Sequence, residues 1–187
     1  MNFHLTKAFL IDVEWIANLE SDTYSGIDVI PFATLRGWFQ ANPEIFYIIR
    51  DHEGRPVGHI DILPLREKVL QPFIQGTMIE RDILPEGLYT AEEKDQVTDL
   101  YIESVAIPYL KGYARAVALR DALAGIRLII GNLCNPNPQT TLYAMPASTE
   151  GLQLMEHIGF RLLVNGQTRK DGHSLYVLPL TDFLVGS

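Results

Sequence analysis

The chain has 187 residues, of which 47% are hydrophobic and 20% are charged, as expected for one globular domain with a sizeable core, so we expect a single domain over residues 1–187. No apolar run approaches the roughly 20 residues that span a bilayer. The formal net charge of −8 argues against a nucleic-acid partner. A single cysteine, Cys134, excludes an internal disulfide and a thiolate metal cluster and fits a reducing compartment. Composition therefore predicts a soluble, cytoplasmic protein that binds neither membranes nor nucleic acids.

The N-terminal third predicts two helices and three strands. Residues 3–7 alternate apolar and polar side chains, which predicts a strand. Asp12 has the side chain of an N-cap and predicts a helix that runs to about Glu20. A second helix is predicted from Pro31 to Asn42. The segments "IFYIIR" and "PVGHIDIL" then flank the turn "DHEG", which predicts a β-hairpin.

Residues 64–99 form a long connection with a strongly acidic second half. Their pattern predicts one helix followed by an irregular loop. Residues 80–99 hold seven acidic and two basic residues, a local charge of −5. Connections of this length are often functional or mobile.

The next segment predicts a strand, a turn, a long helix and a second strand. The apolar run "LYIESVAI", residues 100–107, predicts a buried strand, and residues 140–144 predict the next one. A short helix then ends at Gly159, which suits a left-handed C-cap, and a closing hairpin follows. The long helix between the strands has apolar residues at spacings of three and four, which predicts a stripe packed on the sheet: Ala116, Leu119, Leu123, Ile126 and Ile130.

The turn before the long helix is a candidate anion site. The first turn of a helix has free N–H groups, and the helix dipole favours negative charge there. Residues 109–127 contain four basic residues and one acidic residue, a local charge of +3 in an acidic chain. This pattern indicates either a phosphate-binding turn or a solvated helix face that happens to be basic.

The order of strand, small-residue turn, helix, strand and short helix ending in "MEHIGF" resembles the acyl-CoA half of the GNAT superfamily of N-acetyltransferases. The resemblance extends to "DVEWIANLE" near the N-terminus and to the hairpin "RPVGHIDI". It implies an α/β (α+β) fold with a mixed, mainly antiparallel sheet of about six or seven strands and helices on both faces. It also implies a gap where the strands at 100–107 and 140–144 separate.

The resemblance implies a site for the acyl donor, acetyl-CoA, at the turn and on the strand before it. In the family, backbone amides of a Gln/Arg-x-x-Gly-x-Gly/Ala motif hold the pyrophosphate. Here Lys111 stands for Gln or Arg, Ala114 for the first glycine and Ala116 for the permitted alanine. The preceding strand would hold the pantetheine arm. The implied donor-binding residues are Val105, Ala106, Ile107, Lys111, Gly112, Tyr113, Ala114, Arg115 and Ala116.

Acetyl transfer to an amine needs a base for the ammonium and an acid for the leaving thiolate. The resemblance implies that Glu103 is the base, and the alternative is a structural, partner-paired carboxylate. Many family members carry a tyrosine acid four residues before the glycine of "GF", where this chain has Met155. Tyr143 is the candidate substitute, or else a core or rim tyrosine. His59 and Asp61 share one face of a strand and either point into an acceptor cleft or face solvent. No His, Asp and Glu cluster has convincing metal-ligand spacing, so we expect no metal site.

These features predict an enzyme that transfers an acetyl group from acetyl-CoA to a primary amine of a small molecule or a protein. The alternative is a catalytically inactive GNAT-like binding or regulatory module. The acidic residues 80–99 predict a negative rim that attracts a basic small-molecule or peptide amine, or else a flexible solvated loop. A homodimer is compatible with this architecture.

Overall fold

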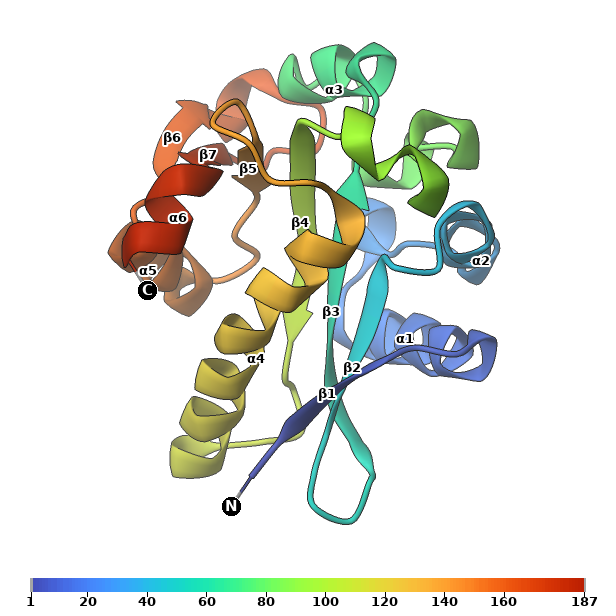
Figure 1. The fold of residues 1–187 in the computed structure, drawn as a ribbon, viewed down its shortest axis with the longest axis vertical. Coiled ribbons are helices and arrows are strands. Elements are labelled where there is room, and N and C mark those ends of the chain that lie inside the picture. Colours follow the sequence, from blue (N-terminus) through green and yellow to red (C-terminus); the bar gives the residue numbers. More distant parts are fainter. Residues whose placement is uncertain (1, 187) are drawn as a thin grey trace.

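The fold is built on one mixed sheet of seven strands (Figure 1). The structure is a computed structural model that describes residues 2–186. The strands lie in the order β1-β2-β3-β4-β5-β7-β6, and neighbours are antiparallel except for the parallel pair β4 and β5. This confirms the expected mixed, mainly antiparallel sheet. The strands are β1 (His4–Lys7), β2 (Phe46–Arg50), β3 (Pro56–Pro64), β4 (Asp99–Ala106), β5 (Thr141–Ala144), β6 (Arg161–Val164) and β7 (Leu175–Pro179).

Helices cover both faces of this sheet. They are α1 (Leu10–Thr23), α2 (Phe32–Ala41), α3 (Glu67–Ile74), α4 (Gly112–Leu133), α5 (Thr149–Ile158) and α6 (Leu180–Gly186). Phe46 and Tyr47 of β2 mark the two faces, because successive side chains of a strand point to opposite sides. The ring of Phe46 lies 6.4 Å from that of Phe39 on α2, whereas the Tyr47 hydroxyl accepts a hydrogen bond from Asn132 on α4. The N-terminal helices therefore lie on one face and α4 on the other, as Figure 1 shows.

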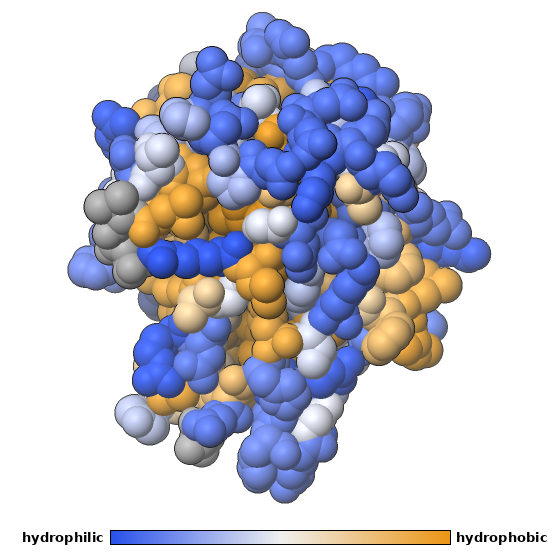
Figure 2. Space-filling model, viewed as in Figure 1, coloured by the Kyte–Doolittle hydropathy of each residue, from blue (hydrophilic) through white to orange (hydrophobic). Residues whose placement is uncertain are grey.

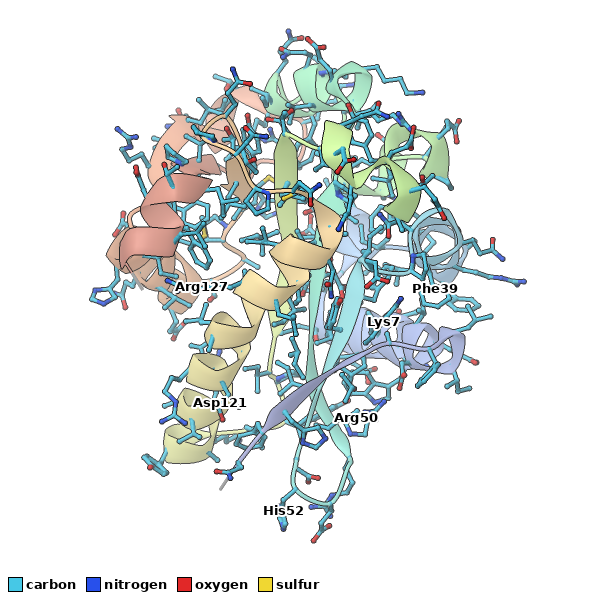
Figure 3. The ribbon with its side chains drawn as sticks, in the orientation of Figure 1. Lys7, Phe39, Arg50, His52, Asp121 and Arg127 are labelled. Atoms are coloured by element: carbon cyan, nitrogen blue, oxygen red, sulfur yellow. The ribbon has the colours of Figure 1, made fainter. Side chains whose placement is uncertain are left out.

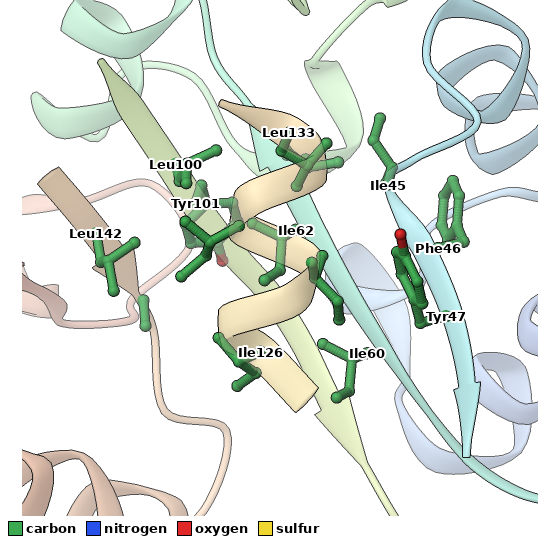
Figure 4. Packing of buried hydrophobic residues seen from close by; sticks show 14 of the residues in the cluster. Ile45, Phe46, Tyr47, Ile60, Ile62, Leu100, Tyr101, Ile126, Leu133 and Leu142 are labelled. Carbon is green, nitrogen blue, oxygen red and sulfur yellow. The ribbon is translucent and has the colours of Figure 1, made fainter. Parts of the chain in front are cut away.

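The core between α4 and the sheet fixes the central strands. Ile60 and Ile62 of β3 lie beneath α4, close to Ile126 and Leu133 of that helix (Figure 4). Each of these four side chains is at most 1% exposed. Burying a side chain of this size stabilises the fold by roughly 1.5–3 kcal/mol. The strands that carry the candidate site residues are thus held in a well-packed layer.

The predicted apolar stripe of α4 is wrong at Ala116 and only partly covered at Leu119 and Leu123, which pack against the edge of the core. Ile126 and Ile130 pack in the core, but Ala116 is exposed and Leu119 and Leu123 are only half-buried. The buried face of α4 is rotated around the helix axis from the predicted stripe and extends further toward the C-terminus. It includes Ala118, Ala122, Ile126, Ile129, Ile130 and Leu133. The first turns of α4 have no strand beneath them to cover the predicted stripe, because β4 and β5 separate there.

Asp12 does not cap α1 in the predicted way. The helix begins at Leu10, and its N-cap is Phe9. Asp12 lies in the first turn, where one carboxylate oxygen accepts a hydrogen bond from the Phe9 amide at 2.9 Å. The other oxygen lies 2.7 Å from Nη2 of Arg50, which reaches over from β2 (Figure 3). The Asp12 side chain thus satisfies the backbone amide of the N-cap residue and also links α1 to the sheet.

Residues 64–99 follow the predicted outline of one helix and an irregular segment. After α3 the chain forms three 3-10 turns, at Glu80–Asp82, Pro85–Gly87 and Ala91–Gln96. Trp38 of α2 is fully buried against this segment and donates a hydrogen bond to the carbonyl of Ile83 at 2.8 Å. Among the residues described, no helix combines the length and apolarity that crossing a bilayer would require.

Candidate active site

The two parallel strands at the centre of the sheet pair only over part of their length. Their register runs from Asp99 opposite Thr141 to Ile102 opposite Ala144. β5 ends there, whereas β4 continues to Ala106. The gap that the sequence predicted beside these strands is therefore present, and it exposes the edge of β4 from Glu103 onward.

A cavity of about 720 Å³ occupies this gap. Leu119 and Leu123 of α4 form one wall, which explains why they are not covered by the sheet. Tyr24, at the end of α1, lines the cavity from the opposite face of the sheet, so the cavity reaches both faces. In Figure 2 apolar surface gathers beside α4, between this helix and the C-terminal elements. α5 and the segments around it supply further lining residues, among them Met145, Pro146, Ser148, Gly151, Leu154 and Phe160.

The predicted donor-binding residues lie together at the outer part of this cavity. Gly112 begins α4 with a φ of +55°, a left-handed conformation that favours glycine. Lys111 is the N-cap residue. The exposed Tyr113 and the half-buried Ala114 belong to the same turn without lining the cavity. The remaining members do line it: Val105, Ala106, Ile107, Gly112, Arg115 and Ala116. Free N–H groups of the first helical turn thus converge on the cavity mouth.

A β-bulge directs Glu103 toward the inner end of the cavity. Across β3 and β4, Asp61 pairs with Ser104 and Ile62 pairs with Ile102, so Glu103 is the extra residue on β4. A bulge of this kind re-aims a side chain that would otherwise alternate to the other face. The Glu103 carboxyl group lies within hydrogen-bonding reach of Asp61, on the α1 side of the sheet.

Glu103 is half-buried and adjoins three buried ionisable side chains. The four are here called the acid–histidine cluster: Glu20, His59, Asp61 and Glu103. Nδ1 of His59 lies 2.9 Å from Oδ2 of Asp61. One donor atom from each of Glu20, His59 and Asp61 lies within 4.8 Å of the others. Their residues are 1%, 0% and 0% exposed. His59 and Asp61 therefore neither line the cavity nor face solvent, the two positions that the sequence suggested, but lie behind Glu103.

Glu20 was missed by sequence reasoning, although a signal existed. It follows Val13, Ile16 and Ala17 at spacings of three and four, which places a carboxyl group on the buried stripe of α1. A charged side chain in an apolar stripe needs a partner or a proton. The spacing therefore indicates a special environment, but it does not identify the residues that surround it.

Burial shifts the acid–base properties of this region. Burial, reinforced by the Glu20, Glu80 and Asp61 carboxylates, raises the pKa of Glu103 well above its usual value. Burial also raises the pKa values of Glu20 and Glu80 to about 7. Burial opposes the charged form of His59, but Asp61 outweighs it, so the pKa of this imidazole is raised. At neutral pH the cluster holds protons that exposed carboxylates would have lost.

A second cavity of about 100 Å³ adjoins the inner end of the first. Tyr24 and Glu103 line both cavities, and Asp28, Glu80 and His173 line the smaller one. Three carboxyl groups therefore surround a space of the size of a small polar group. The acidic segment 80–99 contributes Glu80 here. Three of its other acids have partners elsewhere: Glu93 pairs with Arg66, Asp95 with Asn135, and Asp99 with Tyr143.

No protein-family profile matches this chain, and no curated protein does. Solved structures do match it. The loading GNATL domain of CurA from Lyngbya majuscula superposes with a TM-score of 0.67 at 12% identity, over 97% of this chain and 99% of that one. The GNAT-like decarboxylase GphF, in complex with isobutyryl-CoA, has a TM-score of 0.61 at 15% identity, over 95% of this chain and 99% of that one. Aminoglycoside acetyltransferase AAC(6')-Ib, in complex with coenzyme A, has a TM-score of 0.56 at 14% identity, over 98% of each chain.

This chain has the GNAT fold. Tyr143, the candidate acid predicted from the sequence, and Tyr24 occupy different places in this fold. Tyr143 points away from the cavity, and its hydroxyl group donates to Asp99 at 3.2 Å. Tyr24 lines both cavities beside Glu103, and burial raises the pKa of its phenol. No sequence pattern selects Tyr24, because this residue follows the last turn of α1 without any motif around it.

Proposed function

We propose that this protein transfers the acetyl group of acetyl-CoA to a primary amine. The single observation that carries the proposal is the course of the larger cavity. It runs from the N-terminus of α4, through the gap between β4 and β5, to the Glu103 carboxyl group. Two proteins of similar fold are described in complex with isobutyryl-CoA and with coenzyme A, which supports a CoA thioester as the ligand.

The residues of the cavity suit the parts of such a ligand. Amide groups of the turn at residues 111–116, with Lys111 and Arg115 beside them, favour a pyrophosphate. The unpaired edge of β4 at Val105 and Ala106, together with Ile107 directly after the strand, offers backbone groups to a pantetheine amide. The thioester would then lie at the inner end, next to Glu103.

The inner end supplies groups for both proton transfers. Glu103 is placed to accept the proton of the attacking ammonium, and Tyr24 is placed to donate a proton to the leaving thiolate. Tyr24 replaces Tyr143 in this role, because the Tyr143 hydroxyl is bonded to Asp99 outside the cavity. Holding the two reactants together supplies a large part of the rate enhancement in such transfers.

The smaller cavity favours a cationic acceptor. Asp28, Glu80 and Glu103 place three carboxyl groups around it. The pKa of Glu80 is about 7, so this carboxyl group is partly ionised at neutral pH. Its ionised form attracts a protonated amine and repels a substrate carboxylate. The acidic wall therefore supports an amine acceptor.

Decarboxylation of a carboxylated acyl-CoA is a second candidate, since GphF is described as a GNAT-like decarboxylase. It predicts release of carbon dioxide without any acceptor. Acetyl transfer predicts release of free CoA thiol only when an amine is present. A catalytically inactive binding module would bind acetyl-CoA and give neither product.

The test is a thiol-release assay with acetyl-CoA and a panel of amines, run on the wild type and on Glu103→Gln. We expect the substitution to lower turnover roughly 100-fold or more at neutral pH, since general base catalysis contributes on this scale. Asp99→Asn is the matched control, because Asp99 lies on the same strand and bonds to Tyr143 and Thr98 away from the cavity. Thiol release that is absent with every amine, or unaffected by Glu103→Gln, would contradict the proposal.

A further inference from the structure

Glu103 presents a chemical difficulty as a base. Burial and the neighbouring carboxylates raise the pKa of Glu103 well above its usual value, which favours the protonated form of this carboxyl group. A protonated carboxyl group accepts the proton of an ammonium only if its own proton leaves at the same time. A second acceptor must therefore lie behind it.

Asp61 occupies that position. The carboxyl groups of Asp61 and Glu103 are within hydrogen-bonding reach of each other. Oδ1 of Asp61 and Oε2 of Glu103 are both buried and contact no N–H or O–H donor of the described residues. Two carboxyl groups can form a hydrogen bond only when one of them carries a proton. A proton shared between these groups satisfies both atoms.

The contacts continue from Asp61 deeper into the protein. Its other oxygen, Oδ2, lies 2.9 Å from Nδ1 of His59. Nε2 of His59 and both carboxylate oxygens of Glu20 are buried and have no hydrogen-bond partner among the described residues. Glu20 also lies within 4.8 Å of the other two side chains. Each side chain of the acid–histidine cluster therefore has at least one buried polar atom without a hydrogen-bond partner among the described residues.

The groups that face this cluster come from every element around it. Glu20 comes from α1, His59 and Asp61 from β3, Glu103 and Tyr101 from β4, Tyr24 from the end of α1, and Glu80 from the 3-10 turn Glu80–Asp82. Within residues 2–186, no lysine or arginine forms an ion pair with a member of the cluster. The negative charge of the buried carboxylates must therefore be neutralised by protons bound to the side chains themselves.

We propose that the acid–histidine cluster is a proton chain in which Asp61, His59 and Glu20 take up the proton that passes through Glu103. This rests on the proposed acetyl transfer. The ammonium gives its proton to the free oxygen of Glu103, and the proton on Oε2 of Glu103 moves to Oδ1 of Asp61. A rotation of the Glu20 side chain, which lies within 4.8 Å, brings one of its oxygens to Nε2 of His59, and the imidazolium gives this proton to Glu20. Asp61, His59 and Glu20 all become neutral. One proton enters, no group is oxidised, and the amine is left neutral for attack.

Infrared spectroscopy tests the resting state of the chain without any need for activity. The wild type in deuterated buffer at neutral pH should show the carbonyl band of a protonated carboxyl group. Glu103→Gln should remove the part of this band that Glu103 contributes, whereas the part from Glu20 and Glu80, whose pKa values are about 7, should remain. Asp61→Asn should shift the Glu103 part, and Asp99→Asn should leave the band unchanged. The proposal would be overturned, even if the enzyme were active, by a wild type without the band. It would also be overturned by a band that neither Glu103→Gln nor Asp61→Asn changes.

Kinetics test the transfer itself. In Glu20→Gln and His59→Gln, Glu103 is intact but the deeper acceptors are disabled, so kcat should fall about tenfold or more at neutral pH while KM for acetyl-CoA is unchanged. Turnover should recover at alkaline pH, where the amine is already neutral. An equal loss at every pH would show that the residues only maintain the structure and would overturn the proposal.

A divalent cation held by Glu20, His59 and Asp61 is the competing account. It predicts stoichiometric metal in the purified protein, or loss of the infrared band and a higher melting temperature when Mn²⁺ is added. Either result would overturn the proton chain. Absence of both, with the band present, supports it.

Discussion

At the scale of single residues, the site depends on carboxyl groups placed where water cannot reach them. Glu20 and Asp61 are at most 1% exposed, and the bulge on β4 brings Glu103 against them. Burying ionised groups without partners is costly, so such groups keep their protons and their pKa values rise. Holding these groups beside the cavity therefore lowers the free energy of unfolding at neutral pH.

This cost is measurable through Glu20. Burial raises its pKa from 4.5 to about 7, so the folded chain binds this proton more tightly than the unfolded chain. The resulting stabilisation is complete below the unfolded pKa and is lost as pH rises toward 7, a change of about 3 kcal/mol. Glu20→Gln should therefore raise the melting temperature at pH 8, and the gain should shrink toward pH 5.

Glu14→Gln is the matched control, since Glu14 lies on the same helix and is exposed. It should change the melting temperature little at either pH. A gain for Glu20→Gln that is the same at pH 5 and pH 8 would contradict the assigned burial effect.

At the scale of elements, the chain order of strands and helices follows from the sequence, but the site does not. Alternation and apolar spacing predict β2, β3, α4 and the C-cap at Gly159, whose φ is +108°. The bulge at Glu103 depends on how β3 and β4 align, and this register is set by packing between strands. The acid–histidine cluster joins α1, β3 and β4, so no local pattern predicts it. The predicted stripe of α4 is wrong at Ala116, because spacing shows which residues share a face, not what that face contacts.

The first turn of α4 makes a prediction of its own. Arg115 lines the cavity mouth, whereas Arg120 is paired with Asp121 on the outside of the same helix. Arg115→Glu should weaken acetyl-CoA binding by roughly 1–3 kcal/mol, the range for charge-assisted hydrogen bonds, and Arg120→Glu should have a much smaller effect. Titration calorimetry measures both. Equal losses would mean that the turn acts only through the overall charge of the helix.

The apolar wall of α4 can be tested by filling the cavity. Leu123 lines it, whereas Leu128, on the same helix, is 62% exposed. Leu123→Trp adds a large ring to the space that the proposed ligand would occupy, so affinity for acetyl-CoA should fall about tenfold or more. Leu128→Trp introduces the same side chain outside and should leave affinity unchanged. If both variants bind as the wild type does, the ligand does not use this cavity.

At the scale of the whole molecule, charge is divided between the two ends of one cavity. The chain carries a net charge of −8. The outer end of the larger cavity nevertheless begins at the basic turn that holds Lys111 and Arg115. The inner end meets Asp28, Glu80 and Glu103. An anionic donor and a cationic acceptor would each be attracted to the matching end, and salt would screen both attractions. The GNAT fold creates the passage between them by separating β4 from β5.

The most direct measurement is a calorimetric titration of the wild-type protein with acetyl-CoA at low ionic strength. The account predicts saturable binding of one acetyl-CoA per chain, weakened by Arg115→Glu and by Leu123→Trp. A folded protein, verified by circular dichroism, that gives no binding heat and no protection from thermal unfolding by acetyl-CoA would contradict it.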